Sequence, residues 1–288
     1  MHAIFRLSKK IKNQEKNQIK TIVHKVLLLL LCSSKQKHTL KKLFSLVVIA
    51  FILNSCSNKM RVTSIQPSSI QLNNTSTEDE AIKSLIEPYK SVLDNEMNEV
   101  LINSTAEAVK GQPESTLGNL IADITLWESN NILQKKNLPL ADICMLNNGG
   151  LRTSLPQGKI IVGKIFELMP FENEIVVLTL SGEKALGLLN YIARSNGQPL
   201  AGATLVIKDE KPENILIGGQ AFDTTKTYRV ITSDYLAGGG DKMRFFSQPI
   251  SYQLLNVKLR DAIINYMRTE NKKGNTLNPK TDGRIKIN

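Results

Sequence analysis

The sequence predicts one α/β domain of the mixed, α+β kind over residues 78–288, built on a mixed sheet with helices packed outside it. Apolar runs typical of buried strands alternate with segments at helical spacing, and some strand-like runs also follow one another directly. About 210 residues fit a single domain, and the chain contains no internal repeat.

The first half of the domain is expected to begin with a helix. Ser76-Thr77-Glu78 places hydroxyl caps before an acid, and apolar residues recur at helical spacing as far as Met97, with Pro88 expected to kink or restart the helix. A weaker strand pattern follows at 99–109 and an amphipathic helix at 114–133. The apolar run "ADICML" then predicts a strand that ends in an Asn-Gly turn.

The second half alternates in the same way. We expect a short strand and helix, a strand, a helix capped by Ser181, three further strands and a final helix, at 158–173, 174–180, 181–195, 202–208, 214–220, 227–236 and 252–269.

Residues 1–55 have the composition of an export leader. Two apolar runs, 26–32 and 43–53, are each shorter than the roughly 20 residues of a membrane-spanning helix. The second run follows two lysines and ends just before Cys56, as in a secretory signal. Because tandem apolar runs are unusual, we interpret residues 1–39 as an over-extended gene start.

The segment before Cys56 also resembles a bacterial lipoprotein signal, which implies cleavage before Cys56 and lipidation of its thiol. The alternative is an uncleaved signal followed by a chance cysteine. Residues 56–77 then form a lipid anchor and a polar tether. We expect the protein in the bacterial cell envelope, facing the periplasm at the outer membrane and touching the membrane only through its lipid.

The net charge of +11 does not belong to the domain. Residues 1–60 carry 12 of the 37 basic residues and one of the 26 acidic residues, so residues 61–288 hold 25 of each. A neutral domain lacks the basic surface that neutralises polynucleotide phosphates. We therefore expect no nucleic-acid partner.

Histidine is confined to positions 2, 24 and 38, ahead of Cys56. A processed chain could form neither a Ser/His/Asp or Cys/His triad nor a histidine-rich metal centre, and its carboxylates show no metal-ligand spacing. We expect no catalytic residue and no metal site here. Cys144 is interpreted as a buried apolar residue, with a nucleophile as the alternative.

Three loops combine glycine or proline with polar or aromatic side chains: 147–152 (NNGGLR), 169–173 (MPFEN) and 237–246 (AGGGDKMRFF). Each also has a purely structural interpretation, as a tight turn, a core phenylalanine and a flexible turn. The third loop is no P-loop, since no Gly-Lys-Ser/Thr follows. The functional alternative is a site for a flat ring, a sugar or a phosphate.

Taken in order, "NNGGLR", "GKIFELMPFENEIVVLTLSGEKALGLL" and "FDTTKTYRVITSDYLAGGGD" resemble the C-terminal domain of the bacterial 5'-nucleotidase family, over most of residues 95–288. The resemblance implies that family's fold and a nucleotide or nucleoside ligand. In the family, a separate N-terminal metallophosphoesterase domain holds two divalent metals.

The resemblance also assigns site residues. Asn147 matches a base-contacting asparagine, Arg152 the phosphate-binding arginine that follows the glycines of its turn, and Phe171 the first of two stacking aromatics. The substrate-binding set implied is Asn147, Gly149, Gly150, Arg152, Phe171, Gly239, Gly240, Asp241 and Met243. Two positions depart from the pattern: Met243 stands where we place the second aromatic, and Thr116 where a further arginine is expected.

No metallophosphoesterase segment precedes the domain in this sequence. The predicted function is therefore a lipid-anchored nucleotide- or nucleoside-binding subunit of a split 5'-nucleotidase. A separately encoded metallophosphoesterase would be its partner and supply both metals, with no cofactor in this chain. The alternatives are a non-catalytic binding module for a small ligand and a structural lipoprotein.

Overall fold

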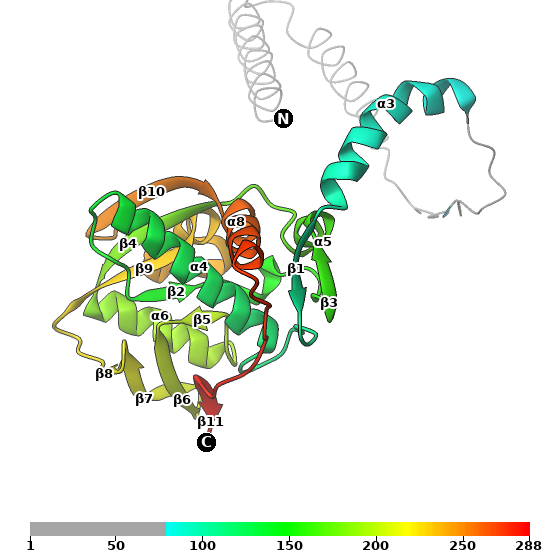
Figure 1. Ribbon diagram of the computed structural model, residues 1–288. Coiled ribbons are helices and arrows are strands. Elements are labelled where there is room, and N and C mark those ends of the chain that lie inside the picture. Colours follow the sequence, from blue (N-terminus) through cyan, green and yellow to red (C-terminus); the bar gives the residue numbers. More distant parts are fainter. Residues whose placement is uncertain (1–68, 70–78) are drawn as a thin grey trace, which may run out of the picture. The chain divides into compact units, whose positions relative to one another are not determined.

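A computed structural model describes Ser69 and residues 79–288 (Figure 1). The chain divides into two compact units, Met1–Ser76 and Thr77–Asn288, and the fold below is that of the second. The predicted leader, Cys56 and the tether apart from Ser69 lie outside the described residues. Within the described part, no helix combines the length and the apolar character needed to cross a membrane.

The centre of the domain is a mixed five-stranded sheet with the strand order β10-β4-β9-β2-β5. Strands β2 and β9 are parallel, and the other neighbours are antiparallel. The predicted fold class is therefore confirmed. In the order of the sheet, the strands span Ser251–Lys258, Glu174–Ser181, Thr227–Ser233, Ile143–Met145 and Leu200–Ala201.

Helices cover both faces of this sheet (Figure 1). Helices α4 (Thr116–Lys135) and α8 (Leu259–Lys272) pack on one face and α6 (Gly182–Arg194) on the other. Along β4, Ile175 and Val177 enter the first core cluster, whereas Val176 and Leu178 enter the second. A strand buried on both faces needs apolar residues at successive positions, which explains the run "EIVVLTL".

Smaller sheets flank the centre. A four-stranded sheet has the order β11-β6-β7-β8, and β1 pairs antiparallel with β3. These strands span Ile285–Ile287, Ala203–Lys208, Lys211–Ile217, Gln220–Ala221, Val100–Ser104 and Gly158–Ile161. The remaining helices are α3 (Glu80–Met97), α5 (Val162–Leu168) and the short α7 (Asp234–Ala237).

The predicted final helix at 252–269 is wrong in its first half. Residues 251–258 form β10, which extends the sheet by hydrogen bonding to β4, and α8 begins only at Leu259. The strand expected at 227–236 is also too long, since it ends at Ser233. The Ser233 side chain accepts a hydrogen bond from Leu236 N and starts α7.

Helix α3 differs from expectation at its start. Its N-cap is Asp79, whose carboxylate accepts hydrogen bonds from the main-chain nitrogens of Ala81 and Ile82. The helix runs through Pro88 without interruption. None of its residues is fully buried. Most of the apolar side chains that predicted it are exposed, and Met97 at its end is partly buried against the first core cluster.

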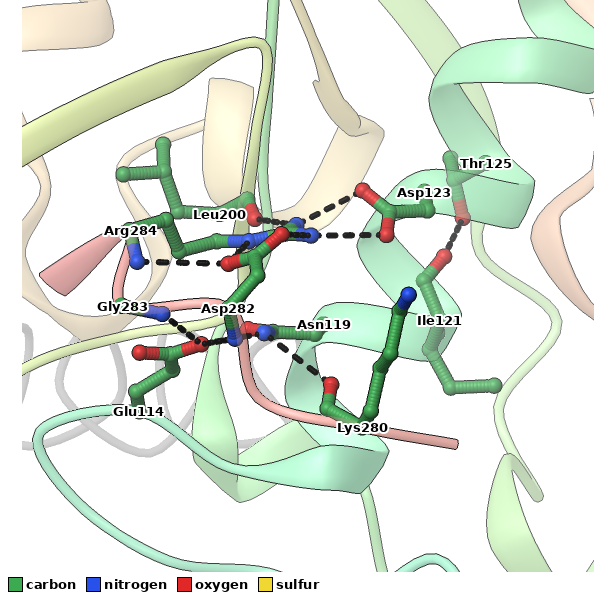
Figure 2. Close-up of polar contacts among 10 residues, drawn as sticks. All are labelled: Glu114, Asn119, Ile121, Asp123, Thr125, Leu200, Lys280, Asp282, Gly283 and Arg284. Carbon is green, nitrogen blue, oxygen red and sulfur yellow. Dashed lines mark hydrogen bonds and ion pairs between the residues drawn. The ribbon is translucent and has the colours of Figure 1, made fainter. Parts of the chain in front are cut away.

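Arg284 ties the C-terminal segment to α4 (Figure 2). Its guanidinium donates to both Asp123 oxygens at 2.6 and 2.9 Å, to Asp282 and to the Leu200 carbonyl. Nearby, Glu114 Oε1 accepts from the main-chain nitrogen of Asp282 at 2.7 Å. Only 11% of the Arg284 side chain is exposed. This network places β11 beside β6.

We expect Arg284→Ala to lower the free energy of unfolding by about 2 kcal/mol, because two partly desolvated carboxylates lose their cation. Urea denaturation measures the change. Arg268→Ala is the matched control, since the Arg268 side chain is 41% exposed and its ion pair with Glu99 at the surface contributes little. Equal losses in the two variants would contradict this account.

The contribution of the Arg284 ion pairs to the free energy of unfolding should depend on pH. Hydrogen bonds from Arg284 lower the pKa of Asp282 in the folded state. The pKa of Asp282 in the unfolded chain is near 4, and its pKa in the folded protein is lower. The ion pair therefore stabilises the fold fully at a pH above the unfolded-state pKa, and this stabilisation is lost as the pH falls through the folded-state pKa. The difference in unfolding free energy between wild type and Arg284→Ala should therefore shrink below about pH 4. A constant difference down to about pH 2 would contradict it.

Candidate functional site

Strand directions bring the three predicted loops to one edge of the central sheet. Because β2 and β9 are parallel, the segments after both strands leave the sheet at the same edge. Strand β4 is antiparallel to β9, so it begins at that edge, and the loop 169–173 before it joins the others. The strand order and directions are thus enough to bring these loops, which are distant in the sequence, to the same edge of the sheet.

A cavity of about 320 Å³ lies among these loops, at the lower end of the range for small-molecule sites. Its lining residues are Asn147, Gly149, Gly150, Arg152, Phe171, Asn173, Tyr235 and Asp241. Six of them belong to the nine predicted site residues, so the structure brings most of that set together. Gly239 and Gly240 lie in the loop just before Asp241.

The first wall is the turn after β2. Asn148–Gly150 forms a single 3₁₀ turn, and the main-chain nitrogen of Arg152 donates to the Leu168 carbonyl at 2.8 Å. The Arg152 guanidinium is exposed, and its one hydrogen bond is a long one, 3.5 Å to the Gly149 carbonyl. Within residues 79–288 no carboxylate pairs with Arg152, so its charge is free to meet an anion.

Gly150 is required for the position of Asn147. A Cβ at Gly150 would lie 2.6 Å from Asn147 Oδ1, whereas one at Gly149 would make only ordinary contacts. We expect Gly150→Ala to displace the Asn147 amide and lower the melting temperature by about 2–4 °C, as for the loss of roughly 1 kcal/mol. Gly149→Ala, in the same turn, should leave the melting temperature unchanged. A larger fall in the melting temperature for Gly149→Ala than for Gly150→Ala, measured by calorimetry, would contradict this role of Gly150.

Asp241 organises the second wall. Its carboxylate accepts hydrogen bonds from Asn147 Nδ2 at 2.6 Å and from the Tyr235 hydroxyl at 2.9 Å. Its carbonyl accepts from the Tyr191 hydroxyl at 3.2 Å. Burial, followed by the charges of Asp241 and Tyr235, raises the pKa of Tyr191 above its usual value. Each Asp241 oxygen retains capacity for a further donor.

Gly240 packs against Tyr235, because a Cβ there would lie 2.5 to 2.7 Å from three atoms of the tyrosine ring. Gly239 adopts a φ of 92°, in the left-handed region that favours glycine. The glycines therefore shape the loop behind Tyr235 and Asp241, and they do not line the cavity themselves.

The expectation that Met243 faces the ligand needs correction. Met243 is fully buried in the second core cluster, between two short 3₁₀ turns, and it does not line the cavity. The second aromatic at the cavity is Tyr235, which is 50% exposed. Sequence reasoning missed it because the apolar pattern of "TYRVITSDYL" predicts a strand to its end. The signal available was Ser233-Asp234, a helix-capping pair.

Two other positions lie near the turn. Thr116 does not line the cavity, and its hydroxyl accepts a hydrogen bond from the main-chain nitrogen of Val109 at 2.9 Å. Lys110 was not predicted, and its ammonium donates to the Leu151 carbonyl at 2.7 Å, directly beside Arg152 in the sequence. It adds a second positive charge close to the turn.

Nothing in the described part of the chain offers a metal centre. No group of three or more His, Cys, Asp and Glu residues is placed to hold an ion there. Cys144 is fully buried in β2, and burial, followed by the charge of Asp123, raises the pKa of its thiol. A thiol in that environment is a poor nucleophile.

A larger hollow of about 490 Å³ lies elsewhere, between the end of α3, α5 and α8. Its principal cation, Arg268, is already paired with Glu99. The smaller cavity is the better candidate because polar, aromatic and cationic groups from three loops converge on it.

Comparison with known proteins places this geometry in a family. The profile of the family described as 5'-nucleotidase, C-terminal domain, matches residues 93–248. The chain is 29% identical to a trifunctional nucleotide phosphoesterase protein of Bacillus subtilis over 238 residues, which cover 71% of this chain and 15% of the relative. It is 26% identical to a 5'-nucleotidase of Vibrio vulnificus over 175 residues, 57% of this chain and 30% of the relative.

A crystal structure of a 5'-nucleotidase precursor from Thermus thermophilus has the same fold, with a TM-score of 0.60 and 23% identity. The match covers 73% of this chain and 43% of that one. The chain thus spans less than half the length of these relatives. Because the family profile matches more than half of the chain, the protein belongs to the 5'-nucleotidase C-terminal domain family.

Proposed function

We propose that the cavity binds a nucleotide or nucleoside, and that the protein is the ligand-binding subunit of a split 5'-nucleotidase anchored in the cell envelope by lipid on Cys56. The family relationship supports a substrate-binding role of the nucleotidase kind. The observation that carries the proposal is the convergence of two aromatic rings, a free arginine and a carboxylate on one cavity.

Each group suits one part of a nucleotide. Phe171 and Tyr235 are exposed and can stack on a flat base, which aromatic side chains do without strong base preference. Asp241 can accept hydrogen bonds from sugar hydroxyls, and the Asn147 amide can bond a base edge. Arg152, with Lys110 behind it, supplies positive charge for a phosphate.

In the proposed enzyme, hydrolysis is carried out by a second polypeptide. Among the described residues, no group of three or more His, Cys, Asp and Glu is placed to hold a metal ion. Helix α3, which begins before the matched region, exposes apolar side chains along its length, among them Leu85, Tyr89 and Leu93. A partner subunit that carries two divalent metals and covers this helix would complete the enzyme.

Calorimetric titration of the detergent-solubilised protein with AMP, adenosine and ribose 5-phosphate tests the binding proposal. We expect AMP to bind most tightly, because it alone combines base, sugar and phosphate. Absence of heat with all three ligands at millimolar concentration would refute it. AMP binding in this titration, combined with no co-purifying partner and no AMP hydrolysis in native membranes, would favour a stand-alone binding module instead.

The partner is tested by purifying the tagged protein from its native membranes and assaying phosphate release from AMP. We expect a co-purifying metallophosphoesterase, and activity that requires both polypeptides and is lost with a chelator. Repeated recovery of the protein alone, with no AMP hydrolysis in the intact membranes, would contradict the split enzyme.

A further inference from the structure

The loop that carries Phe171 is fixed from behind by one buried arginine. Arg260, the second residue of α8, is 5% exposed. Its Nη1 donates to the carbonyls of Met169 and Phe171, at 3.3 and 3.5 Å, and its Nη2 donates to the Glu172 carboxylate. A single guanidinium therefore holds three residues of a five-residue loop.

The arginine is itself held in place. Its guanidinium carbon lies 4.0 Å from the centre of the Phe166 ring on α5, a cation–π contact. Because the side chain is packed on that ring and almost excluded from water, it has few alternative positions. The donors that meet the loop are thus set by the packing of α5 against α8.

Neighbouring residues complete the attachment. Lys258 forms a second ion pair with the Glu172 carboxylate, and the Leu259 main-chain nitrogen donates to the Asn173 carbonyl at 2.9 Å. Hydrogen bonds from Lys258 and then Arg260 lower the pKa of Glu172 to about 2, so the pair stays ionised at neutral pH. The junction of β10 and α8 therefore contacts the loop from Met169 to Asn173.

The side chain of Phe171 takes no part in this attachment and remains 45% exposed at the cavity. The loop backbone is held while the ring is left available. Holding a stacking ring in place before the ligand arrives reduces the entropy lost on binding.

We propose that Arg260 is a positioning residue for base recognition, which fixes loop 169–173 so that the Phe171 ring is preset for stacking. This inference rests on the proposed function and goes beyond it, because Arg260 lies outside the cavity. The proposal makes two distinct predictions. Loss of Arg260 should loosen the loop, and it should weaken the binding of ligands that carry a base but not the binding of a ligand that lacks one.

The test compares Arg260→Lys with Arg268→Lys in the full-length protein. Both arginines lie on α8, but Arg268 pairs with Glu99, away from the loop. Hydrogen exchange should accelerate about tenfold at the amides of Phe171, Glu172 and Asn173 in Arg260→Lys only. Adenosine affinity should fall about five- to tenfold in the same variant, with ribose 5-phosphate affinity unchanged. Unchanged loop exchange, or equal loss of both ligands, would overturn the proposal.

Two further variants guard against a folding defect. Glu172→Gln changes an exposed side chain that contacts Arg260, and it should show the same pattern more weakly. Placing Arg260→Lys in a Phe171→Ala background should cause no further loss of adenosine affinity, because Arg260 acts through that ring. Additive losses would overturn the positioning role. A wild-type protein that binds no nucleoside refutes the proposed function and the stacking role together, whereas loop exchange still decides whether Arg260 fixes the loop.

Discussion

We expect Phe171→Ala to weaken adenosine and AMP binding about 10- to 100-fold, the effect of losing a stacking face worth roughly 1–3 kcal/mol. The Phe171 ring is exposed at the cavity and its main chain is held by Arg260, so the truncation should leave the fold intact. Isothermal titration measures both affinities.

Tyr235→Phe is the companion variant, because it keeps the second ring and removes only the hydroxyl that donates to Asp241. It should lose less affinity than Phe171→Ala. Ribose 5-phosphate affinity should be unchanged in Phe171→Ala, since that ligand has no base. Unaltered adenosine binding in Phe171→Ala would contradict a stacking role for this ring.

Arg152→Ala should weaken AMP about 10- to 100-fold while leaving adenosine within about twofold, because a hydrogen bond to a charged group contributes roughly 1.5–3 kcal/mol. The guanidinium has no carboxylate partner among residues 79–288, so its removal breaks no ion pair. The ratio of AMP to adenosine affinity is the measured quantity.

Arg152→Lys distinguishes charge from geometry. Lysine keeps the charge but loses the planar pair of donors, so the AMP preference should fall only in part. Lys164→Ala is a suitable control, since Lys164 pairs with Glu167 on α5 and does not line the cavity. An equal loss of AMP and adenosine affinity in Arg152→Ala would contradict a phosphate-specific role.

Most of the fold follows from local patterns in the sequence. Ser115 and Ser181 cap α4 and α6, and the burial of β4 on both of its faces explains its uninterrupted apolar run. The error at 252–258 has a different origin. Its residues suit a helix continuous with α8, but hydrogen bonds to the exposed edge of β4 outweigh that local preference, and such a partner is invisible to periodicity.

The candidate site was predictable to a similar extent. Asn147, Arg152 and Phe171 each follow a recognisable apolar element, and the parallel pairing of β2 with β9 brings their loops to one cavity. Met243 was wrongly predicted to line the site, because its position in a glycine-rich loop does not reveal that its side chain is buried in the core. Arg260 had no sequence signal, since its role arises from contacts with a loop about 90 residues away.

The split organisation that we propose rests on the chemistry of the site more than on the fold. The chain shares its architecture with longer nucleotidases, yet the described residues offer aromatic, amide and cationic groups without a metal site. Such a set suits recognition of a phosphate monoester, whereas a metal pair activates water for its hydrolysis. In the proposed enzyme, recognition and hydrolysis are divided between two polypeptides.

A crystal structure of the protein grown with AMP is the most direct test of the central claim. We predict the base against Phe171 and Tyr235, the sugar hydroxyls on Asp241, and the phosphate within hydrogen-bond distance of Arg152. Crystals grown at saturating AMP that show this cavity empty, or AMP bound elsewhere on the domain, would contradict it.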